Sequence, residues 1–234
     1  MGEPRKNSLL HRAAALMPTS MDPEQFRAEL RAIGVDVSRE TLRALETYAG
    51  LLRKWQKAIN LISAATVDDL WRRHFLDSAQ LLPLLAPLEL EDGGVTDLGS
   101  GAGFPGLVIA LLSDRPVHLV ESDQRKAAFL GEVSRAVGCA GRVQIHTARV
   151  EALKPWRAAT ISARALADLT QLLDWASPFV TPDTICVFPK GAKAEDELTA
   201  AQRHWKMNIE RRRSITDSTG LILRLSHLER RGQT

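Results

Sequence analysis

The stretch Val95-Thr-Asp97-Leu-Gly99-Ser-Gly101-Ala-Gly103-Phe104-Pro105-Gly106 decides the fold of this chain. Residues 95–98 predict a short strand, and a helix is predicted over 104–112. The glycines between them have no Cβ, so they adopt positive φ easily and let the backbone approach a ligand closely. The stretch therefore predicts a strand, a glycine turn and a helix, with a binding site at the turn.

The chain beyond this stretch alternates short apolar runs with helical patterns. Such alternation predicts a parallel sheet with helices on both faces. A helix and two further strands, around 206–214 and 221–225, are expected between Glu195 and Leu228, which gives a mostly parallel, seven-stranded Rossmann-like α/β fold. The other predicted strands are 117–121, 142–146, 160–163 and 184–189, and the other predicted helices are 124–137 and 169–179.

The chain before the stretch is helical in pattern. Asp22-Pro-Glu-Gln25 has the residues of a helix start, and Gly34 ends that helix. Ser38 caps a longer helix, and one more is predicted over 68–85, followed by a polar turn over 89–94. We therefore predict a flexible tail (1–21), a helical N-terminal subdomain (22–90) and a ligand-binding domain (91–234).

The composition excludes several classes of protein. Two cysteines, Cys139 and Cys186, are too few for a disulfide framework, and no spacing typical of a zinc site is present. No apolar run reaches the roughly 18 residues of a membrane span. The formal net charge of +3 suits a nucleic-acid partner without establishing one. We expect a cytoplasmic monomer that uses no metal and does not bind membranes.

Two kinds of ligand fit the glycine turn. Gly101-Ala-Gly103-Phe-Pro-Gly106 matches the dinucleotide pattern GxGxxG, and Glu121 lies at the distance of a ribose-binding acid. Asp97, followed by alternating Gly99, Gly101 and Gly103, is instead typical of methyltransferases that use S-adenosylmethionine (SAM). An acid at the strand end suits the cationic end of SAM better than a pyrophosphate. We therefore favour SAM, held by these residues and Glu121.

Several segments in order resemble the RsmG (GidB) family, the bacterial guanine-N7 methyltransferases of small-subunit ribosomal RNA. The resemblance covers about residues 26–191. Two departures are Gln56, where the family often has Asn, and Ala163, which shifts the usual Ser-Arg register. The similar segments are Trp55-Gln-Lys-Ala-Ile-Asn-Leu-Ile62, Arg73-His-Phe-Leu-Asp-Ser78, Asp97–Gly106, Val120–Leu130, Arg149-Val-Glu151, Ser162-Ala-Arg-Ala165 and Lys190-Gly191.

The resemblance implies both a reaction and a set of contacts. It implies methyl transfer from SAM to N7 of a guanine in 16S ribosomal RNA. The substrate that it implies is this RNA within a small ribosomal subunit or an assembly intermediate of that subunit. The residues that it implies in contact with SAM are Gly99, Phe104, Val150, Glu151 and Arg164.

The residues themselves favour a target nitrogen without a proton. Guanine N7 carries a free lone pair, so its methylation needs alignment in a dry pocket and no general base. The Asn/Asp-Pro-Pro-aromatic motif that is common for exocyclic amines is missing after the predicted strand 160–163. Pyrimidine C5 needs a thiolate, and Cys139 and Cys186 are interpreted as structural. Arg164 and Lys190 follow predicted strands, so we take them as the catalytic candidates that hold the base or a phosphate.

Other side chains have weaker claims. For His74, the role of a packed, hydrogen-bonded core residue fits slightly better than a functional role. Asp77 and Ser78 are expected to cap or support the local structure and not to catalyse. The arginines at 211–213 and 230–231 fit solvated charges or phosphate contacts. Three other functions stay open at this point: a SAM-dependent methyltransferase of a non-RNA substrate, an NAD-binding oxidoreductase, and a non-catalytic RNA-binding assembly factor.

Overall fold

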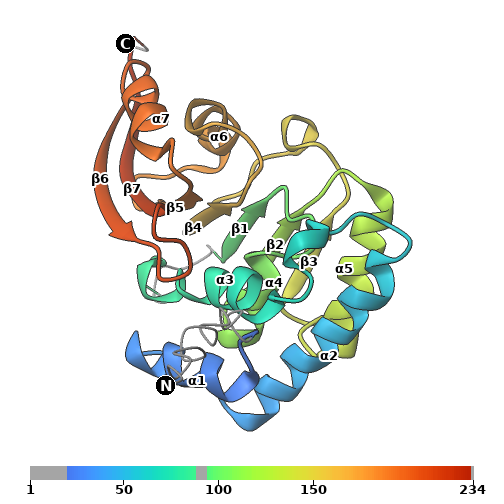
Figure 1. The fold of residues 1–234 in the computed structure, drawn as a ribbon. Coiled ribbons are helices and arrows are strands. Elements are labelled where there is room, and N and C mark those ends of the chain that lie inside the picture. The colour runs from blue at the N-terminus through green and yellow to red at the C-terminus, as the bar shows by residue number, and fades with distance from the viewer. Residues whose placement is uncertain (1–19, 88–93, 233–234) are drawn as a thin grey trace, which may run out of the picture.

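A computed structural model describes residues 20–87 and 94–232 (Figure 1). Its centre is a seven-stranded sheet in the order β3-β2-β1-β4-β5-β7-β6, in which only the β5–β7 and β7–β6 pairs are antiparallel. This confirms the predicted mostly parallel sheet. The strands are β1 (Val95–Leu98), β2 (Val117–Val120), β3 (Val143–His146), β4 (Thr160–Ala163), β5 (Ile185–Lys190), β6 (Trp205–Arg213) and β7 (Leu221–Arg230).

Helices cover the sheet on both sides, as predicted. The helices α4 (Gly106–Leu112) and α5 (Gln124–Ala136) pack on one face, and α6 (Leu169–Ala176) and α7 (Ala194–Ala201) belong to a second apolar cluster on the other (Figure 1). Strands of a parallel sheet end at the same edge. The turns after β1, β2, β4 and β5 therefore meet there.

The N-terminal helices share the core of the sheet domain. Helix α1 (Pro23–Ala32) starts with a capping box of Asp22 and Gln25, and α2 (Arg39–Gln56) is capped by Ser38. Both predicted starts are confirmed. Apolar side chains of α1 and α2 belong to one buried cluster with those of β1, α4 and α5. Three predicted features lie outside the described residues: the boundary at 90/91, the polar turn before residue 94 and most of the tail. The division into domains therefore stays a prediction.

The predicted helix over 68–85 is wrong as a continuous element. The segment forms a π-helical turn (Trp71–Leu76), a short α3 (Asp77–Ala79) and a 3-10 turn (Leu82–Leu84). A π-helical turn widens the backbone, and such turns are frequent at functional sites. Pro83 then stands at the start of the 3-10 turn, where its missing N–H costs nothing.

The other differences are at element ends. Helix α4 begins at Gly106 instead of Phe104, because the loop with positive φ at Gly99, Gly101 and Gly103 continues up to Pro105. Strand β7 extends to Arg230, five residues beyond the predicted end.

Within 20–87 and 94–232, no helix is long and apolar enough to cross a membrane.

Candidate active site

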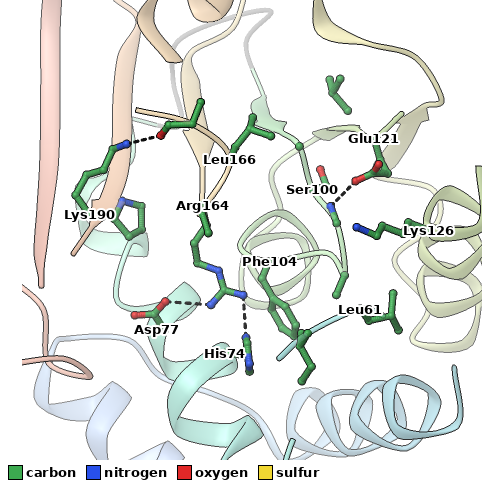
Figure 2. Close-up of a pocket in the computed structure, with 18 of the residues that line it drawn as sticks. Leu61, His74, Asp77, Ser100, Phe104, Glu121, Lys126, Arg164, Leu166 and Lys190 are labelled. Carbon is green, nitrogen blue, oxygen red and sulfur yellow. Dashed lines mark hydrogen bonds and ion pairs between the residues drawn. The ribbon is translucent and has the colours of Figure 1, made fainter. Parts of the chain in front are cut away.

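A cavity of about 800 Å³ lies where the carboxyl ends of β1, β2, β4 and β5 meet (Figure 2). Its walls include the glycine loop after β1, the turns after β2, β3, β4 and β5, the segment 61–77, and the β6–β7 loop. Of the predicted site residues, it is lined by Gly99, Gly101, Phe104, Glu121, Val150, Glu151, Arg164 and Lys190.

The glycine loop gives the cavity a wall of backbone. Gly99 and Gly101 have φ of 64° and 57°, in the left-handed region that side chains rarely adopt. A Cβ on Gly99 would collide with Leu166, whereas a Cβ on Gly101 would meet only the Gly99 carbonyl oxygen, 3.8 Å away. Because Gly101 also lines the cavity, a side chain there would extend into the space for a ligand.

Glu121 lies at the end of β2 and is fixed by the backbone. Its Oε2 accepts a hydrogen bond from the Gly101 amide (2.8 Å), and its Oε1 accepts one from the Asp123 amide (2.7 Å). A carboxylate oxygen can accept more than one hydrogen bond. Each oxygen therefore has capacity for a hydroxyl of a bound sugar, as the predicted role requires.

Asp97 lies beneath the glycine loop, and its predicted contact with SAM stays a prediction. Its side chain is fully buried and lines no part of the cavity. Oδ1 accepts from the Ser162 hydroxyl (2.8 Å) and Oδ2 from the Gly106 amide (3.2 Å). Burial raises the pKa of Asp97 to about 6 in spite of these bonds. The carboxylate joins β1, β4 and the start of α4 beneath the loop.

Gly103 also lies outside the cavity lining. Its φ is 90°, and a Cβ there would collide with the Tyr48 hydroxyl and with Leu107. The Tyr48 hydroxyl donates a hydrogen bond to the Ala102 carbonyl oxygen, and the ring stacks on Phe104. Gly103 therefore lets helix α2 pack against the loop from behind.

Val150 and Glu151 line the end of the cavity beside the β3–β4 turn. The Glu151 Oε1 accepts a hydrogen bond from the indole Nε1 of Trp175 (2.7 Å), which lines the cavity from α6. Sequence reasoning missed Trp175, because its partner is 24 residues away and belongs to another element. Lys126, at the start of α5, completes this end of the cavity (Figure 2).

Arg164 crosses the cavity from the end of β4 to the helical segment before α3 (Figure 2). One terminal nitrogen, NH1, donates to Asp77 Oδ2 (3.1 Å) and to the Arg73 carbonyl oxygen (3.2 Å). The guanidinium carbon lies 5.0 Å from the centroid of the Phe104 ring. Ala163 ends β4, so the residue that follows it enters the cavity. The guanidinium is therefore oriented by charge and by stacking.

The second terminal nitrogen of Arg164 forms a hydrogen bond with His74. Nδ1 of His74 lies 2.8 Å from NH2 of Arg164, and Nε2 of His74 lies 2.8 Å from the Thr66 hydroxyl. Arginine has only donors, so Nδ1 accepts and the proton is assigned to Nε2. Burial, followed by the charges of Arg164 and Arg73, lowers the pKa of His74 to about 3. The imidazole is neutral at pH 7 and both nitrogens are bonded.

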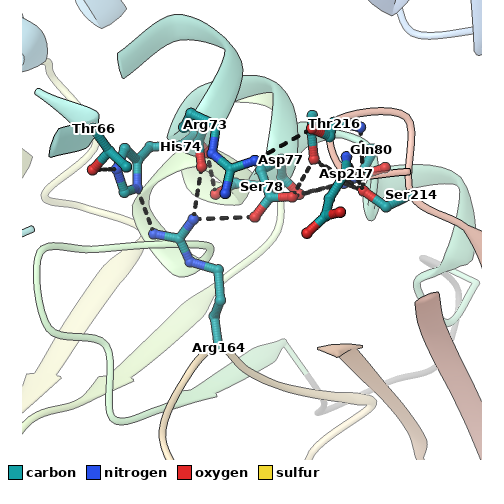
Figure 3. Close-up of polar contacts among 10 residues, drawn as sticks. All are labelled: Thr66, Arg73, His74, Asp77, Ser78, Gln80, Arg164, Ser214, Thr216 and Asp217. Atoms are coloured by element: carbon teal, nitrogen blue, oxygen red, sulfur yellow. Dashed lines mark hydrogen bonds and ion pairs between the residues drawn. The ribbon is translucent and has the colours of Figure 1, made fainter. Parts of the chain in front are cut away.

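The β6–β7 loop joins this group of polar side chains (Figure 3). The Thr216 hydroxyl donates to Asp77 Oδ1 (2.6 Å), and the Ile215 amide donates to Gln80 Oε1 (2.9 Å). We call Arg164, His74, Asp77, Gln80 and Thr216 the polar network. It connects β4, the segment 74–80 and the β6–β7 loop, which are up to 142 residues apart. Sequence reasoning identified Arg164 and its neighbours in the motif but missed Gln80 and Thr216.

Lys190 is held tightly beside the cavity. Its ammonium group lies 2.8 Å from Glu197 Oε2 and donates to the Ala167 carbonyl oxygen (2.7 Å), and the side chain is 8% exposed. Glu197 also accepts from the Leu169 amide (2.9 Å). This geometry supports holding the turn between β4 and α6. The predicted catalytic role of Lys190 stays a prediction.

Gln56 fixes another wall, although it departs from the family pattern. Its Oε1 accepts from the amides of Leu61 (3.0 Å) and Ile62 (3.1 Å), and its Nε2 donates to the Ile62 carbonyl oxygen (2.8 Å). Leu61 and Ile62 line the cavity. The longer amide side chain therefore orders the segment that closes the cavity over Phe104.

Fold and cavity define a Rossmann-like, SAM-dependent methyltransferase. The family model described as rRNA small subunit methyltransferase G matches residues 41–222. The chain belongs to that family. It is 50% identical to ribosomal RNA small subunit methyltransferase G of Rhodospirillum centenum, over 92% of this chain and 97% of that protein. It is 49% identical to the protein of the same name from Rhodospirillum rubrum, over 90% and 100%.

Solved structures share the fold at low sequence identity. The O-methyltransferase TomG from Streptomyces achromogenes superposes with a TM-score of 0.52 and 13% identity, over 88% of this chain and 99% of that chain. An O-methyltransferase from Bacillus cereus superposes with a TM-score of 0.51 and 10% identity, over 88% and 100%.

The geometry also disfavours the dinucleotide alternative. A Rossmann dehydrogenase places the pyrophosphate at the N-terminus of the helix after the glycine turn. Here the Asp97 carboxylate accepts from the Gly106 amide, the first residue of α4. A carboxylate at this position repels a second anion.

Proposed function

We propose that this chain transfers the methyl group of SAM to N7 of a guanine in 16S ribosomal RNA, within a small ribosomal subunit or its assembly intermediate. The family assignment supports rRNA methylation, and the choice of guanine N7 follows the family resemblance. SAM supplies an activated methyl group that the nitrogen lone pair displaces from sulfur in line. The chain's own residues bind, orient and exclude water.

The observation that carries the choice of atom is the chemistry of the cavity lining. Among the described residues, the lining includes no cysteine, and both cysteines are buried elsewhere with pKa values raised by burial. His74 is the histidine of the lining, and Arg164 and Thr66 occupy its two nitrogens. The cavity therefore offers neither the thiolate that pyrimidine C5 requires nor an unoccupied imidazole base. Guanine N7 requires neither.

The glycine loop and Glu121 fit the adenosine and amino-acid parts of SAM. Glu121 presents two carboxylate oxygens fixed by backbone amides, and Gly101 leaves the adjoining space open. Val150 and Glu151 are proposed beside the adenine. Arg164 is proposed as the residue that separates this half of the cavity from the half for the target base. Its binding to Asp77 and His74 fixes that boundary.

Charges near the mouth of the cavity suit the RNA backbone. Lys126 and Arg149 line the cavity, and Arg213 is exposed at the end of β6. None of these three has an ion-pair partner in the part of the chain that the structure describes. Other arginines that sequence analysis considered for phosphate contacts are already paired: Arg211 with Glu195, Arg212 with Glu210, and Arg230 with Asp174. We propose the three unpaired cations as phosphate contacts.

Labelled SAM and small ribosomal subunits from a strain that lacks this modification provide the test. We expect one labelled base, with the methyl group on N7 of guanine. Naked rRNA and an excess of large subunits serve as matched controls for substrate choice. Label on another atom or another base would contradict the proposal, and so would turnover on protein alone.

The remaining features of the proposal concern the state of the protein. We propose that it acts in the cytoplasm as a monomer and without a metal. Light scattering of the purified chain, and activity after exhaustive chelation, test the last two statements separately.

A further inference from the structure

One end of the cavity is lined by the β6–β7 loop, through Ser214, Asp217 and Gly220, and by Leu221 at the start of β7. Asp217 is half-buried in this loop, and in Figure 3 its carboxylate points away from Thr216 and Gln80. The proposed function puts the target base at this end, beyond Arg164. Asp217 is therefore a side chain that a bound base can reach.

The two carboxylate oxygens of Asp217 differ. Oδ1 accepts hydrogen bonds from the amide (2.9 Å) and the hydroxyl (2.8 Å) of Thr219, which closes the turn. Oδ2 has no partner among the residues that the structure describes. The bond from the Thr219 amide is the main cause that lowers the pKa of Asp217, so the group is ionised at neutral pH. One oxygen shapes the loop, and the other is an anionic acceptor open to the cavity.

The neighbouring carboxylates at this end are each paired with a cation. Asp77 accepts from Arg164 and Thr216, and Glu197 accepts from Lys190 and the Leu169 amide. Lys190 and Arg164 are correspondingly neutralised. Within the described residues, both Asp217 and Glu197 keep a carboxylate oxygen without a partner, but Glu197 is ion-paired with Lys190 whereas Asp217 has no ion pair within 4.0 Å.

We propose that Asp217 is a specificity-determining residue that reads the Watson–Crick edge of the target guanine. This inference rests on the proposed function. Guanine presents two donors on that edge, N1–H and the N2 amino group, opposite to N7. Adenine presents an unprotonated N1 acceptor there, which a carboxylate repels. Oδ2 of Asp217 accepting from guanine therefore selects guanine while N7 faces the methyl donor.

The test is Asp217→Asn, because asparagine keeps Oδ1 for the turn and replaces the open acceptor by an amide donor. Guanosine monophosphate and adenosine monophosphate are titrated into the protein saturated with S-adenosylhomocysteine. We expect the wild type to prefer the guanine nucleotide, and the variant to lose about tenfold or more of that preference, the value of one charged hydrogen bond. Affinity for S-adenosylhomocysteine should be unchanged.

Thr219→Ala is the matched control. It removes a bond that Asp217 makes within the loop but leaves Oδ2 in place, so the preference for guanine should persist. Equal loss of preference in both variants would show that Asp217 only shapes the loop and would overturn the inference. No preference in the wild type would overturn it as well.

The same variants separate this inference from the proposed function. Methylation of small subunits is measured in parallel for the wild type and Asp217→Asn. If the wild type methylates guanine N7 and the variant shows unchanged kcat/KM, the inference fails while the function stands. If the wild type methylates a different atom, the proposed function fails, whatever the nucleotide titrations show.

Discussion

The two walls of the cavity are built in different ways. The wall with Gly99, Gly101 and Glu121 is made of backbone amides and one carboxylate, within 23 consecutive residues. The opposite wall is the polar network, made of side chains from β4, the segment 74–80 and the β6–β7 loop. The first wall suits a cofactor such as SAM, whose chemical structure is the same in every reaction. The second is assembled only when distant segments pack together.

Each wall also contains a buried titratable group whose pKa burial shifts in the direction that favours its neutral form. Burial raises the pKa of Asp97 to about 6 beneath the glycine loop and lowers that of His74 to about 3 in the polar network. The difference teaches that one wall holds its ligand through local backbone geometry, and the other through non-local side-chain contacts. The predictions below are designed to damage one wall at a time.

The largest expected effect is that of Gly101→Val on the backbone wall. The side chain would fill cavity space and require a strained positive φ, so we expect affinity for S-adenosylhomocysteine to fall by about 1000-fold or more, measured by calorimetry. Gly138→Val is the matched control. Gly138 has φ of 73° with nothing within 4 Å of an added Cβ, and it does not line the cavity. Equal loss of affinity in both variants would mean that strain, not lost space, is responsible.

Arg164→Ala is expected to damage the polar network most. It removes the partner of Asp77 and His74 and the cation above Phe104, so kcat/KM should fall by about 100-fold, the value of one or two charged hydrogen bonds. Asp77→Asn should show a smaller fall of the same kind. The control is Arg211→Ala, which breaks an exposed pair with Glu195. If methyl transfer by Arg164→Ala were unchanged, Arg164 would have no part in the site.

The two buried groups should respond to pH in opposite directions. Asp97 has a raised folded pKa, so its contribution to stability is lost as the pH rises from 3.8 through 6. His74 has a lowered folded pKa, so its contribution is lost as the pH falls below 6.5. Relative to wild type, the unfolding free energy of Asp97→Asn should therefore rise by about 2 kcal/mol between about pH 4.5 and 6.

Urea titrations at both pH values measure this difference. For His74→Asn, the unfolding free energy relative to wild type should change in the opposite direction over the same interval. Parallel curves for wild type and both variants would refute the claim that burial shifts the pKa values of these two groups.

The smallest effect is expected for Lys190→Met. If Lys190 only holds the turn between β4 and α6, losing its bonds to Glu197 and Ala167 should weaken kcat/KM by about fivefold, because one hydrogen bond contributes about 1 kcal/mol. Lys206→Met, which breaks the exposed pair with Glu229, is the control. A loss of about 100-fold in kcat at unchanged affinity for S-adenosylhomocysteine would instead support the catalytic role that the sequence predicted for Lys190.

The contrast between the walls explains what sequence reasoning could predict. The glycine loop, β1 and the acid after β2 are local patterns, and the predicted strands agree with the structure to within a few residues, except the longer β7. Trp175, Gln80 and Thr216 carry no local signal, because their partners lie in other elements. The orientation of Asp97 carries no local signal either, since a strand-end acid looks the same in sequence whether it points into the cavity or beneath the loop.

The segment 68–85 shows a second limit. Its apolar spacing fits a regular helix, but the backbone forms a π-helical turn over Trp71–Leu76 before α3. That turn presents the Arg73 carbonyl oxygen and the His74 ring to Arg164. Tertiary contacts thus select the irregular backbone over the helix that local pattern favours.

A crystal structure with S-adenosylhomocysteine tests the central claim most directly. The ribose hydroxyls should bind the two oxygens of Glu121, the adenine should lie beside Val150, and the sulfur should face Arg164 across Gly99. A ligand bound at the polar network instead, or density for it outside the cavity, would contradict the assignment of the two walls.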